Sequence, residues 1–343
     1  MPRYGIRGRI NSLTDQERDN WVLPIDLNCY RGMNMRIALV LTPVSDHYLR
    51  LASQVGVSEV VMRCPGLEYS EMLNLKKRIG SFGLNVSVVE GYLPIEDIKL
   101  GGPQRDAEIE QMKTIIRNMG QAEIGVLCYN FMAGGDWTRT ATKERSRGGA
   151  LVTGFDLSAL PTDSPSELVL SSTDLLWENL KYFLEKILPV AEESGVMLAM
   201  HPDDPPLPNF QGFARIMNSV EGFERLVGLV PSPSNGICFC QGSFAEMGID
   251  IPSTIRRLGP HIKYVHFRDI SGIASQFIET FHDNGQTNMV EAMRAYRDIR
   301  YDGPIRPDHV PQLSGEEQGE PGYTMLGRLF AVGYMRGLIQ AVS

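Results

Sequence analysis

The chain has 343 residues, of which 43% are hydrophobic and 22% charged, ordinary values for a globular protein with a full core. A net charge of −8, without a basic stripe interleaved with aromatic residues, argues against a nucleic-acid binder. There is no N-terminal apolar signal segment and no apolar run near the ~18 residues that span a bilayer, so membrane association is not expected. Five cysteines, an odd number without a C-x-x-C motif, indicate a reduced, cytoplasmic protein rather than a disulfide framework.

The first half of the chain alternates between strand-like and helix-like segments. Residues 1–34 are rich in Gly, Arg and Asn and show weak periodicity, so we interpret them as an N-terminal arm. Short apolar runs, each typical of a buried parallel strand, then occur at 36–41, 59–62, 85–90 and 126–129. Amphipathic patterns between them predict helices at 46–55, 70–79 and 105–119.

A long polar segment, 132–171, follows the fourth run. A connection of this length inside a regular alternation is typical of a lid, a binding loop or a subunit contact. Together with the N-terminal arm it suggests a homo-oligomer.

The second half repeats the alternation. The predicted helices are 174–193, 222–230, 251–258, 288–299 and 324–341. The strand-like runs are 196–201, 235–240, 262–266 and 304–309. Eight strand–helix units predict a (β/α)8 TIM barrel, in a single domain over 35–343. A doubly wound sheet is the competing fold, but no G-x-G-x-x-G sequence follows an early strand.

Each of the last four runs leads into a side chain that can bind a metal, namely His201, Cys240, His266 and Asp308. A single histidine at a strand end is more often a packing residue, but successive strand ends of a barrel lie around one mouth. Four such residues at four successive strands therefore predict one divalent metal site.

The cysteine ligand has an alternative. Cys238 lies on the same face of its strand as Cys240, since side chains alternate with period two. We favour Cys240 because it is nearer the loop, and assign Cys238 to the core one layer below. The other cysteines, Cys29, Cys64 and Cys128, are interpreted as small buried hydrophobic residues.

Eight short motifs, spread from about residue 84 to the C-terminus, carry a family resemblance. In the metal-binding half they are His-Pro-Asp-Asp-Pro-Pro (201–206), Phe-Cys-Gln-Gly-Ser (239–243), Val-His-Phe-Arg (265–268), Arg-Pro-Asp-His (306–309) and Pro-Gly-Tyr-Thr (321–324). Upstream they are Ser-Val-Val-Glu (87–90), Glu-Asp-Ile-Lys-Leu-Gly (96–101) and Cys-Tyr-Asn-Phe-Met (128–132) with Asp-Trp-Thr-Arg-Thr (136–140). As a set, they resemble the motifs of the mannonate dehydratase family.

The resemblance implies a xylose-isomerase-like barrel that uses Mn²⁺ or Fe²⁺. It would convert the sugar acid D-mannonate to 2-keto-3-deoxy-D-gluconate, a step of hexuronate breakdown. The family's metal ligands match the four residues above, and its acid/base pair matches His309 and Tyr323. Which of the two is the acid and which the base is left open by the sequence.

Four further residues are candidates for substrate binding. Arg306 comes two residues before Asp308 and Arg268 two residues after His266, and either could hold the substrate carboxylate. Asn130 and Arg139, from the loop after the fourth strand, could bind hydroxyl groups. The sequence departs from the family at the first strand, at Met-Arg-Cys-Pro (62–65) and at Ile95, and we expect these segments to line the substrate side of the mouth.

Two other functions compete with dehydration. A metal-dependent sugar isomerase or epimerase on the same barrel would need the same metal and acid/base groups. A non-enzymatic barrel with a structural metal would not need His309 and Tyr323 beside the ligand Asp308, which argues against it.

Overall fold

The structure is a computed structural model that describes residues 35–160 and 170–343. The arm predicted over 1–34 and part of the 132–171 insertion lie outside the described residues.

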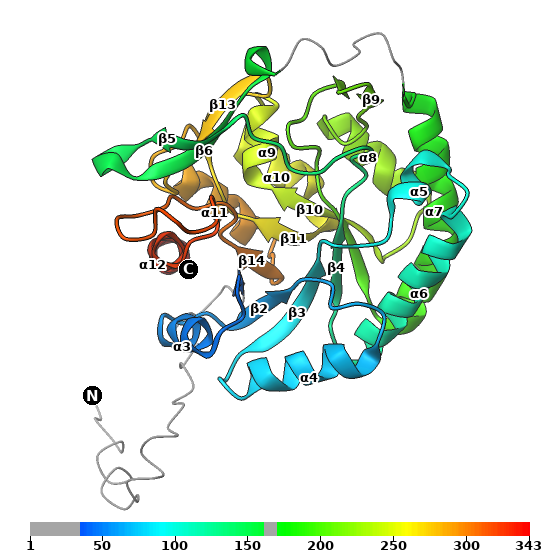
Figure 1. The fold of residues 1–343 in the computed structure, drawn as a ribbon, viewed down its shortest axis with the longest axis horizontal. Coiled ribbons are helices and arrows are strands. Elements are labelled where there is room, and N and C mark those ends of the chain that lie inside the picture. Colours follow the sequence, from blue (N-terminus) through cyan, green and yellow to red (C-terminus); the bar gives the residue numbers. More distant parts are fainter. Residues whose placement is uncertain (1–34, 161–169) are drawn as a thin grey trace, which may run out of the picture.

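Eight parallel strands form a closed barrel at the centre of the fold (Figure 1). In chain order they are β1 (Arg36–Val40), β2 (Glu59–Met62), β3 (Asn85–Glu90), β4 (Val126–Tyr129), β7 (Met197–Met200), β10 (Asn235–Cys240), β11 (Ile262–His266) and β14 (Pro304–Arg306). The ring closes where β14 pairs with β1, with Ile37 in register with Ile305. Because these strands are covered on both faces, they are almost continuously apolar. The predicted TIM barrel is confirmed.

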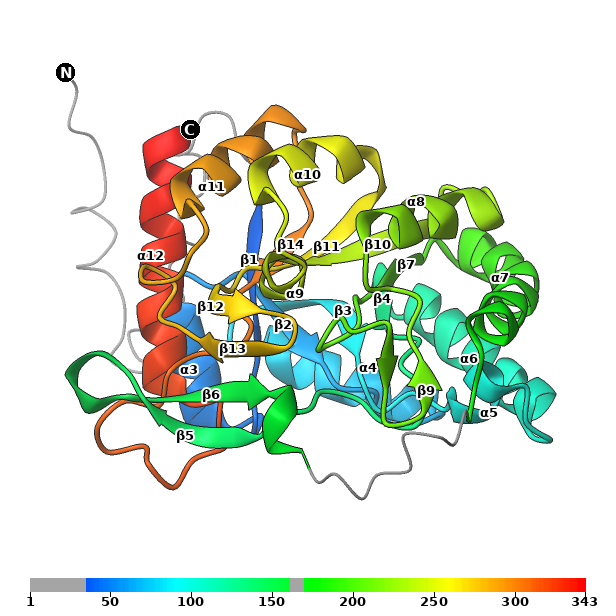
Figure 2. The ribbon, with the colours of Figure 1, turned by 90° about the horizontal axis from the view of Figure 1, so that it is seen from above.

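Helices cover the outside of the barrel between successive strands (Figures 1 and 2). They are α3 (Asp46–Gln54), α4 (Tyr69–Gly80), α6 (Arg105–Gln121), α7 (Thr173–Ser194), α8 (Val220–Leu229), α10 (Ile251–Leu258), α11 (Met289–Asp298) and α12 (Met325–Val342). Local sequence sets their ends, as in α7, where the Ser172 hydroxyl accepts from the Leu175 amide and Gly195 ends the helix at φ 66°.

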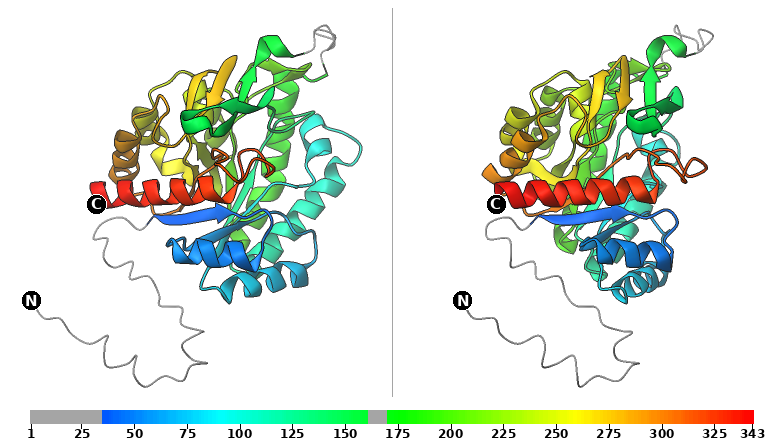
Figure 3. Two further views of the ribbon diagram at one scale, coloured as in Figure 1. Left: turned by 60° about the vertical axis from the view of Figure 1, so that its left-hand side comes forward. Right: turned by 90° about the vertical axis from the view of Figure 1, so that its left-hand side faces the viewer.

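The last helix covers the point where the barrel closes. Figure 3 shows α12 lying beside β1, so that the C-terminal helix packs against the first strand. Arg336 of α12 donates to the backbone carbonyl of Val55, just after α3, at 3.2 Å. The two ends of the barrel domain are thereby tied together.

The insertion after β4 builds a second, smaller sheet. Its strands β5 (Ala141–Arg145) and β6 (Leu151–Asp156) join the hairpin β12 (Ile270–Ile273) and β13 (Gln276–Glu279), in the order β12-β13-β6-β5 (Figure 2). Since the insertion leaves the end of β4 and the hairpin leaves the end of β11, both lie on the side where the barrel strands end. The described part of the insertion is therefore an ordered cover over that side.

Besides the four strands of the small sheet, several short elements were not predicted from the sequence. They are α5 (Glu96–Leu100), α9 (Gln241–Glu246) and the pair β8 (Asn209–Phe210) and β9 (Phe213–Ala214). All are too short to give a periodic signal. In the described part of the chain, no helix combines the length and the apolar character needed to cross a membrane.

The packing of α7 provides a test of the core. Leu184 on α7 is fully buried, whereas Leu326 on α12 is 42% exposed. Leu184→Ala should lower the free energy of unfolding by about 2–5 kcal/mol, because it leaves a cavity. Leu326→Ala, the matched control, should change it by less than about 0.5 kcal/mol. Urea unfolding measures both, and equal effects would contradict the packing described here.

Candidate metal centre and active site

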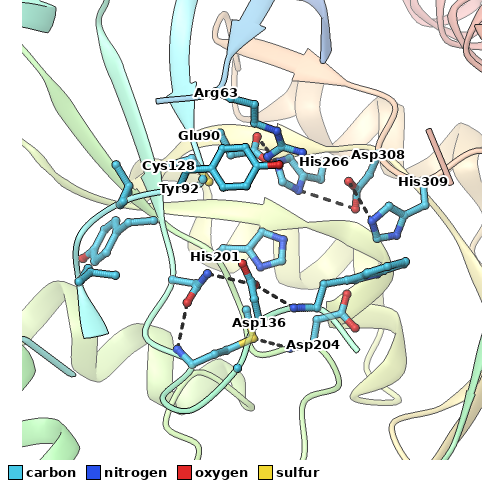
Figure 4. A pocket seen from close by; sticks show the side chains of 18 of the residues that line it. Arg63, Glu90, Tyr92, Cys128, Asp136, His201, Asp204, His266, Asp308 and His309 are labelled. Atoms are coloured by element: carbon cyan, nitrogen blue, oxygen red, sulfur yellow. Dashed lines mark hydrogen bonds and ion pairs between the residues drawn. The ribbon is translucent and has the colours of Figure 1, made fainter. Parts of the chain in front are cut away.

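The four predicted metal ligands lie together, and Figure 4 shows three of them, His201, His266 and Asp308, around one pocket. The ligand atoms of His201, Cys240 and His266 all lie within 4.8 Å of one another. Asp308 borders this group, with its Oδ2 atom 3.7 Å from the Cys240 sulfur and 3.8 Å from His266 Nδ1. The strand register explains the proximity, since Cys240 is paired with His266 across β10 and β11.

The chemistry of this group fits a divalent metal. Burial alone would raise the pKa of the Cys240 thiol, but the charges of Arg268 and His201 hold it well below its ordinary value. The thiolate is the form that binds metals. Burial would lower the pKa of His201, but the neighbouring Cys240 thiolate raises it to about 9. The side chains of this group thus attract positive charge. Bound protons supply that charge on the histidines, and a metal ion would replace them.

Cys238 belongs to a different group. Its sulfur clusters with Cys128 and with His266, inside the barrel. Burial raises the pKa of the Cys238 thiol well above its ordinary value, in contrast to Cys240. The geometry therefore favours Cys240 as the metal ligand. Cys128 is buried, as expected, but it also lines the pocket, which the sequence did not indicate.

His309 and Tyr323 form a hydrogen-bonded pair beside Asp308. His309 Nε2 lies 3.2 Å from the Tyr323 hydroxyl, and Nδ1 lies 2.5 Å from Glu279 Oε1. Burial raises the pKa of Tyr323 above its ordinary value. A histidine that is oriented by a carboxylate on one nitrogen and faces a phenol with the other can pass a proton in either direction.

These groups open into a cavity of about 640 Å³. His201, His266, Asp308, His309 and Tyr323 line it together with residues from the loops after β3 and β4. Figure 4 shows Arg63 and Glu90 on one side of this pocket and Asp136 and Asp204 on another. The volume is in the range of small-molecule sites.

The four predicted substrate-binding residues separate into two pairs. Arg306 and Asn130 line the cavity, whereas Arg268 and Arg139 are not among its lining residues. Arg139 makes a two-pronged ion pair with Asp204, at 2.6 and 3.0 Å, and a third contact of 2.6 Å with Glu279.

Arg268 is likewise occupied by ion pairs within the protein. It bonds Asp308 at 2.9 Å and Asp204 at 2.8 Å, and its side chain is 1% exposed. These guanidinium groups lie behind the cavity wall and hold the carboxylates that face it.

Several groups of this network, Glu90 and Glu279 among them, were not predicted from the sequence. Glu90 is the last residue of β3 and contacts Arg306 at 2.8 Å and His266 at 3.3 Å. Burial would raise its pKa, but Arg306 and His266 hold it well below the ordinary value. Its position at a strand end was a usable signal. Glu279, in the unpredicted strand β13, gave none.

Comparison with known proteins identifies the family. A model of D-mannonate dehydratase (UxuA) matches residues 42–174 and 170–343. The chain belongs to the D-mannonate dehydratase family.

Individual relatives agree with this assignment. The chain is 37% identical over 310 residues to a mannonate dehydratase of Thermotoga neapolitana, covering 80% of this chain and 86% of that protein. The crystal structure of mannonate dehydratase from Streptococcus suis serotype 2 superposes with a TM-score of 0.83 at 34% identity, covering 91% of this chain and 93% of that one. A xylose isomerase domain protein from Planctomyces limnophilus, at 14% identity, a TM-score of 0.58 and coverage of 91% and 98%, shares the fold.

The ion pairs behind the cavity provide a stability test. Arg139→Leu leaves Asp204 and Glu279 buried with one counter-charge fewer, and should lower the free energy of unfolding by about 3–5 kcal/mol. Arg145→Leu is the matched control, because Arg145 is exposed on β5. Chemical unfolding followed by circular dichroism measures both. A loss for Arg139→Leu no greater than for the control would show that the network contributes little.

Proposed function

We propose that the protein is a D-mannonate dehydratase, which converts D-mannonate to 2-keto-3-deoxy-D-gluconate and water. Membership of the family supports the reaction. The observation that carries the proposal is the His309–Tyr323 pair directly beside the metal-binding group, because a purely structural metal site has no need of such a pair. The ion-paired carboxylates and guanidinium groups around the cavity also support the binding of a polar substrate.

We propose His201, Cys240, His266 and Asp308 as the ligands of a divalent metal, Mn²⁺ or Fe²⁺. Two imidazoles, a thiolate and a carboxylate suit either ion. When bound, the ion would supply a Lewis acid for the substrate carboxylate, making the proton on carbon 2 easier to remove. Asp308 is already ionised, since His309, Arg306 and His266 outweigh its burial and hold its pKa well below the ordinary value.

Dehydration needs one group to take the proton from carbon 2 and another to protonate the departing hydroxyl of carbon 3. We assign these two tasks to His309 and Tyr323. Glu279 fixes the orientation of the His309 ring through Nδ1, so that Nε2 faces Tyr323 and the cavity. The 3.2 Å contact between the two groups lets a proton pass between them after each turnover.

For substrate binding we propose Asn130 as a hydroxyl-binding residue from the cavity wall. Arg306 lines the cavity but bonds Glu90 and Asp308, so it contributes mainly fixed positive charge. Arg268 and Arg139, which the sequence suggested for substrate binding, we assign instead to holding Asp308, Asp204 and Glu279 in place. A cytoplasmic location and a homo-oligomer stay predictions of the sequence.

The activity is testable directly. Purified protein with Mn²⁺ or Fe²⁺ should form 2-keto-3-deoxy-D-gluconate from D-mannonate, detected by mass spectrometry as a product lighter by one water. His309→Asn should lower kcat by about 10²- to 10⁴-fold through loss of proton transfer, with metal content unchanged. His261→Asn is the matched control, because His261 precedes β11 and lies at the opposite end of the barrel. A product of unchanged mass would instead indicate an isomerase or epimerase.

The choice of sulfur ligand is testable through metal content. Cys240→Ser should weaken the binding of Mn²⁺ by at least about tenfold, measured by calorimetry and by metal analysis after dialysis. Cys64→Ser is the control, since Cys64 is half-buried and belongs to neither of the described groups of side chains that could hold a metal. Normal binding by Cys240→Ser combined with loss in Cys238→Ser would assign the ligand to Cys238.

A further inference from the structure

Arg63 has no role in the site as described so far, yet its side chain lies in the pocket. It is the first residue beyond β2 and lines the cavity next to Glu90 (Figure 4). Its side chain is 27% exposed, against 2% for Arg306 and 3% for Lys99. Among the described residues that line the cavity, these three are the arginines and lysines. Arg63 is thus the one with a substantial accessible surface.

The electrostatic potential of this cavity disfavours the binding of an anionic sugar acid. The described lining residues include more carboxylates than arginines and lysines; the carboxylates are Glu90, Glu96, Asp136, Asp204, Asp308 and Glu320. The chain as a whole carries a net charge of −8. Besides the proposed metal ion, a side-chain cation that is free to contact the substrate would therefore favour the binding of an anion.

The other two cations are already occupied. Arg306 bonds Glu90 through two nitrogens, at 3.2 and 2.8 Å, and Asp308 at 2.8 Å. Lys99 bonds Glu96 at 2.6 Å and the carbonyl of Met132 at 2.9 Å. Neither has exposed donors to offer a substrate.

Arg63, in contrast, has hydrogen-bonding capacity to spare. Among the described residues it makes one ion pair, a 3.3 Å contact between Nη1 and Glu90, and it also interacts with the side chain of Tyr323. Its Nε atom is buried without a hydrogen-bond partner among the described residues. A guanidinium has five N–H donors in a planar fork that matches the two oxygens of a carboxylate.

The surroundings hold this side chain in position. Its guanidinium lies 5.7 Å from the ring centre of Tyr92 and 5.8 Å from that of Tyr323. Gly91, at φ +77°, approaches so closely that a Cβ there would lie 3.0 Å from Arg63 Nη1. A cation fixed in advance loses little conformational freedom on binding.

We propose that Arg63 binds the carboxylate of the sugar acid and makes this site select acids over uncharged sugars. The proposal rests on the proposed dehydratase function for the identity of the reaction. The binding of a carboxylate by Arg63 does not depend on that function, because Arg63 would bind the carboxylate of any aldonate anion in the same way. The contact with Tyr323 would bring the carboxylate end of the substrate next to the acid/base pair.

The test replaces the charge while keeping a polar side chain. Arg63→Gln should raise KM for D-mannonate roughly 10- to 100-fold, the loss expected for a charge-assisted hydrogen bond, with a smaller change in kcat. Arg63→Lys keeps the charge but not the planar pair of donors, so its KM should lie between the KM values of wild type and Arg63→Gln. Arg105→Gln is the matched control: Arg105 is 31% exposed, pairs with Asp106 and stacks on Tyr182, but lies outside the cavity.

A binding comparison separates this proposal from the proposed reaction. Calorimetry on Mn²⁺-loaded protein would compare D-gluconate, an anion, with D-sorbitol, its uncharged alcohol, in wild type and Arg63→Gln. The expected result is a preference for D-gluconate over D-sorbitol that is about tenfold or more weaker in Arg63→Gln than in wild type, with metal content and circular dichroism unchanged in the variant. If wild type does not dehydrate D-mannonate, the proposed function fails, and this comparison still decides the role of Arg63.

Three results would overturn the role of Arg63. One is a KM of Arg63→Gln within about twofold of wild type. Another is a fall in kcat with a shifted pH profile at unchanged KM, which would make Arg63 a positioning residue for Tyr323. The third is the absence of any preference for D-gluconate over D-sorbitol in wild type.

Discussion

The mouth of this barrel depends on the compensation of buried charge. Arg268, with a side chain 1% exposed, contacts Asp204, Glu246 and Asp308, and it cannot be buried without them. Arg139, Arg268 and Arg306 hold the ionised carboxylates and the Cys240 thiolate in place, but these anions outnumber the three arginines. The pKa values of His201 and His266 are raised because positive charge is in short supply here. A divalent cation is the natural complement of this arrangement, because it supplies that charge without a proton.

The closed barrel makes such a network possible. Parallel strands end at one rim, so β3, β10, β11 and β14 each contribute a charged group to a single volume. The small sheet of β5, β6, β12 and β13 then covers part of that rim and brings Glu279 to the back of His309. A carboxylate from this small sheet therefore orients the group that we assign to proton transfer, so that group depends on the folding of the small sheet.

The barrel and the grouping of the candidate metal-binding side chains could be predicted from the sequence because both are encoded locally. A buried parallel strand is an apolar run, and a candidate ligand such as Cys240 or His266 ends that run. The roles of the arginines could not be predicted in this way. Arg268 and Arg306 occupy similar strand-end positions, yet one lies behind the cavity wall and the other lines it. That difference depends on partners such as Asp204 and Glu90, which are distant in the chain.

The two sides of the pocket follow different physical rules. On the metal side the guanidinium groups of Arg139, Arg268 and Arg306 are each paired with buried carboxylates, so a substitution there disturbs several ion pairs together. On the side formed after β2 and β3, Arg63 keeps its Nε donor unpaired among the described residues and is held by Tyr92, Tyr323 and the close backbone of Gly91. Unpaired donors on a fixed cation lower the stability of the free protein and are recovered only when an anion binds. Selection between substrates is therefore expected to depend on this side, while the chemistry depends on the other.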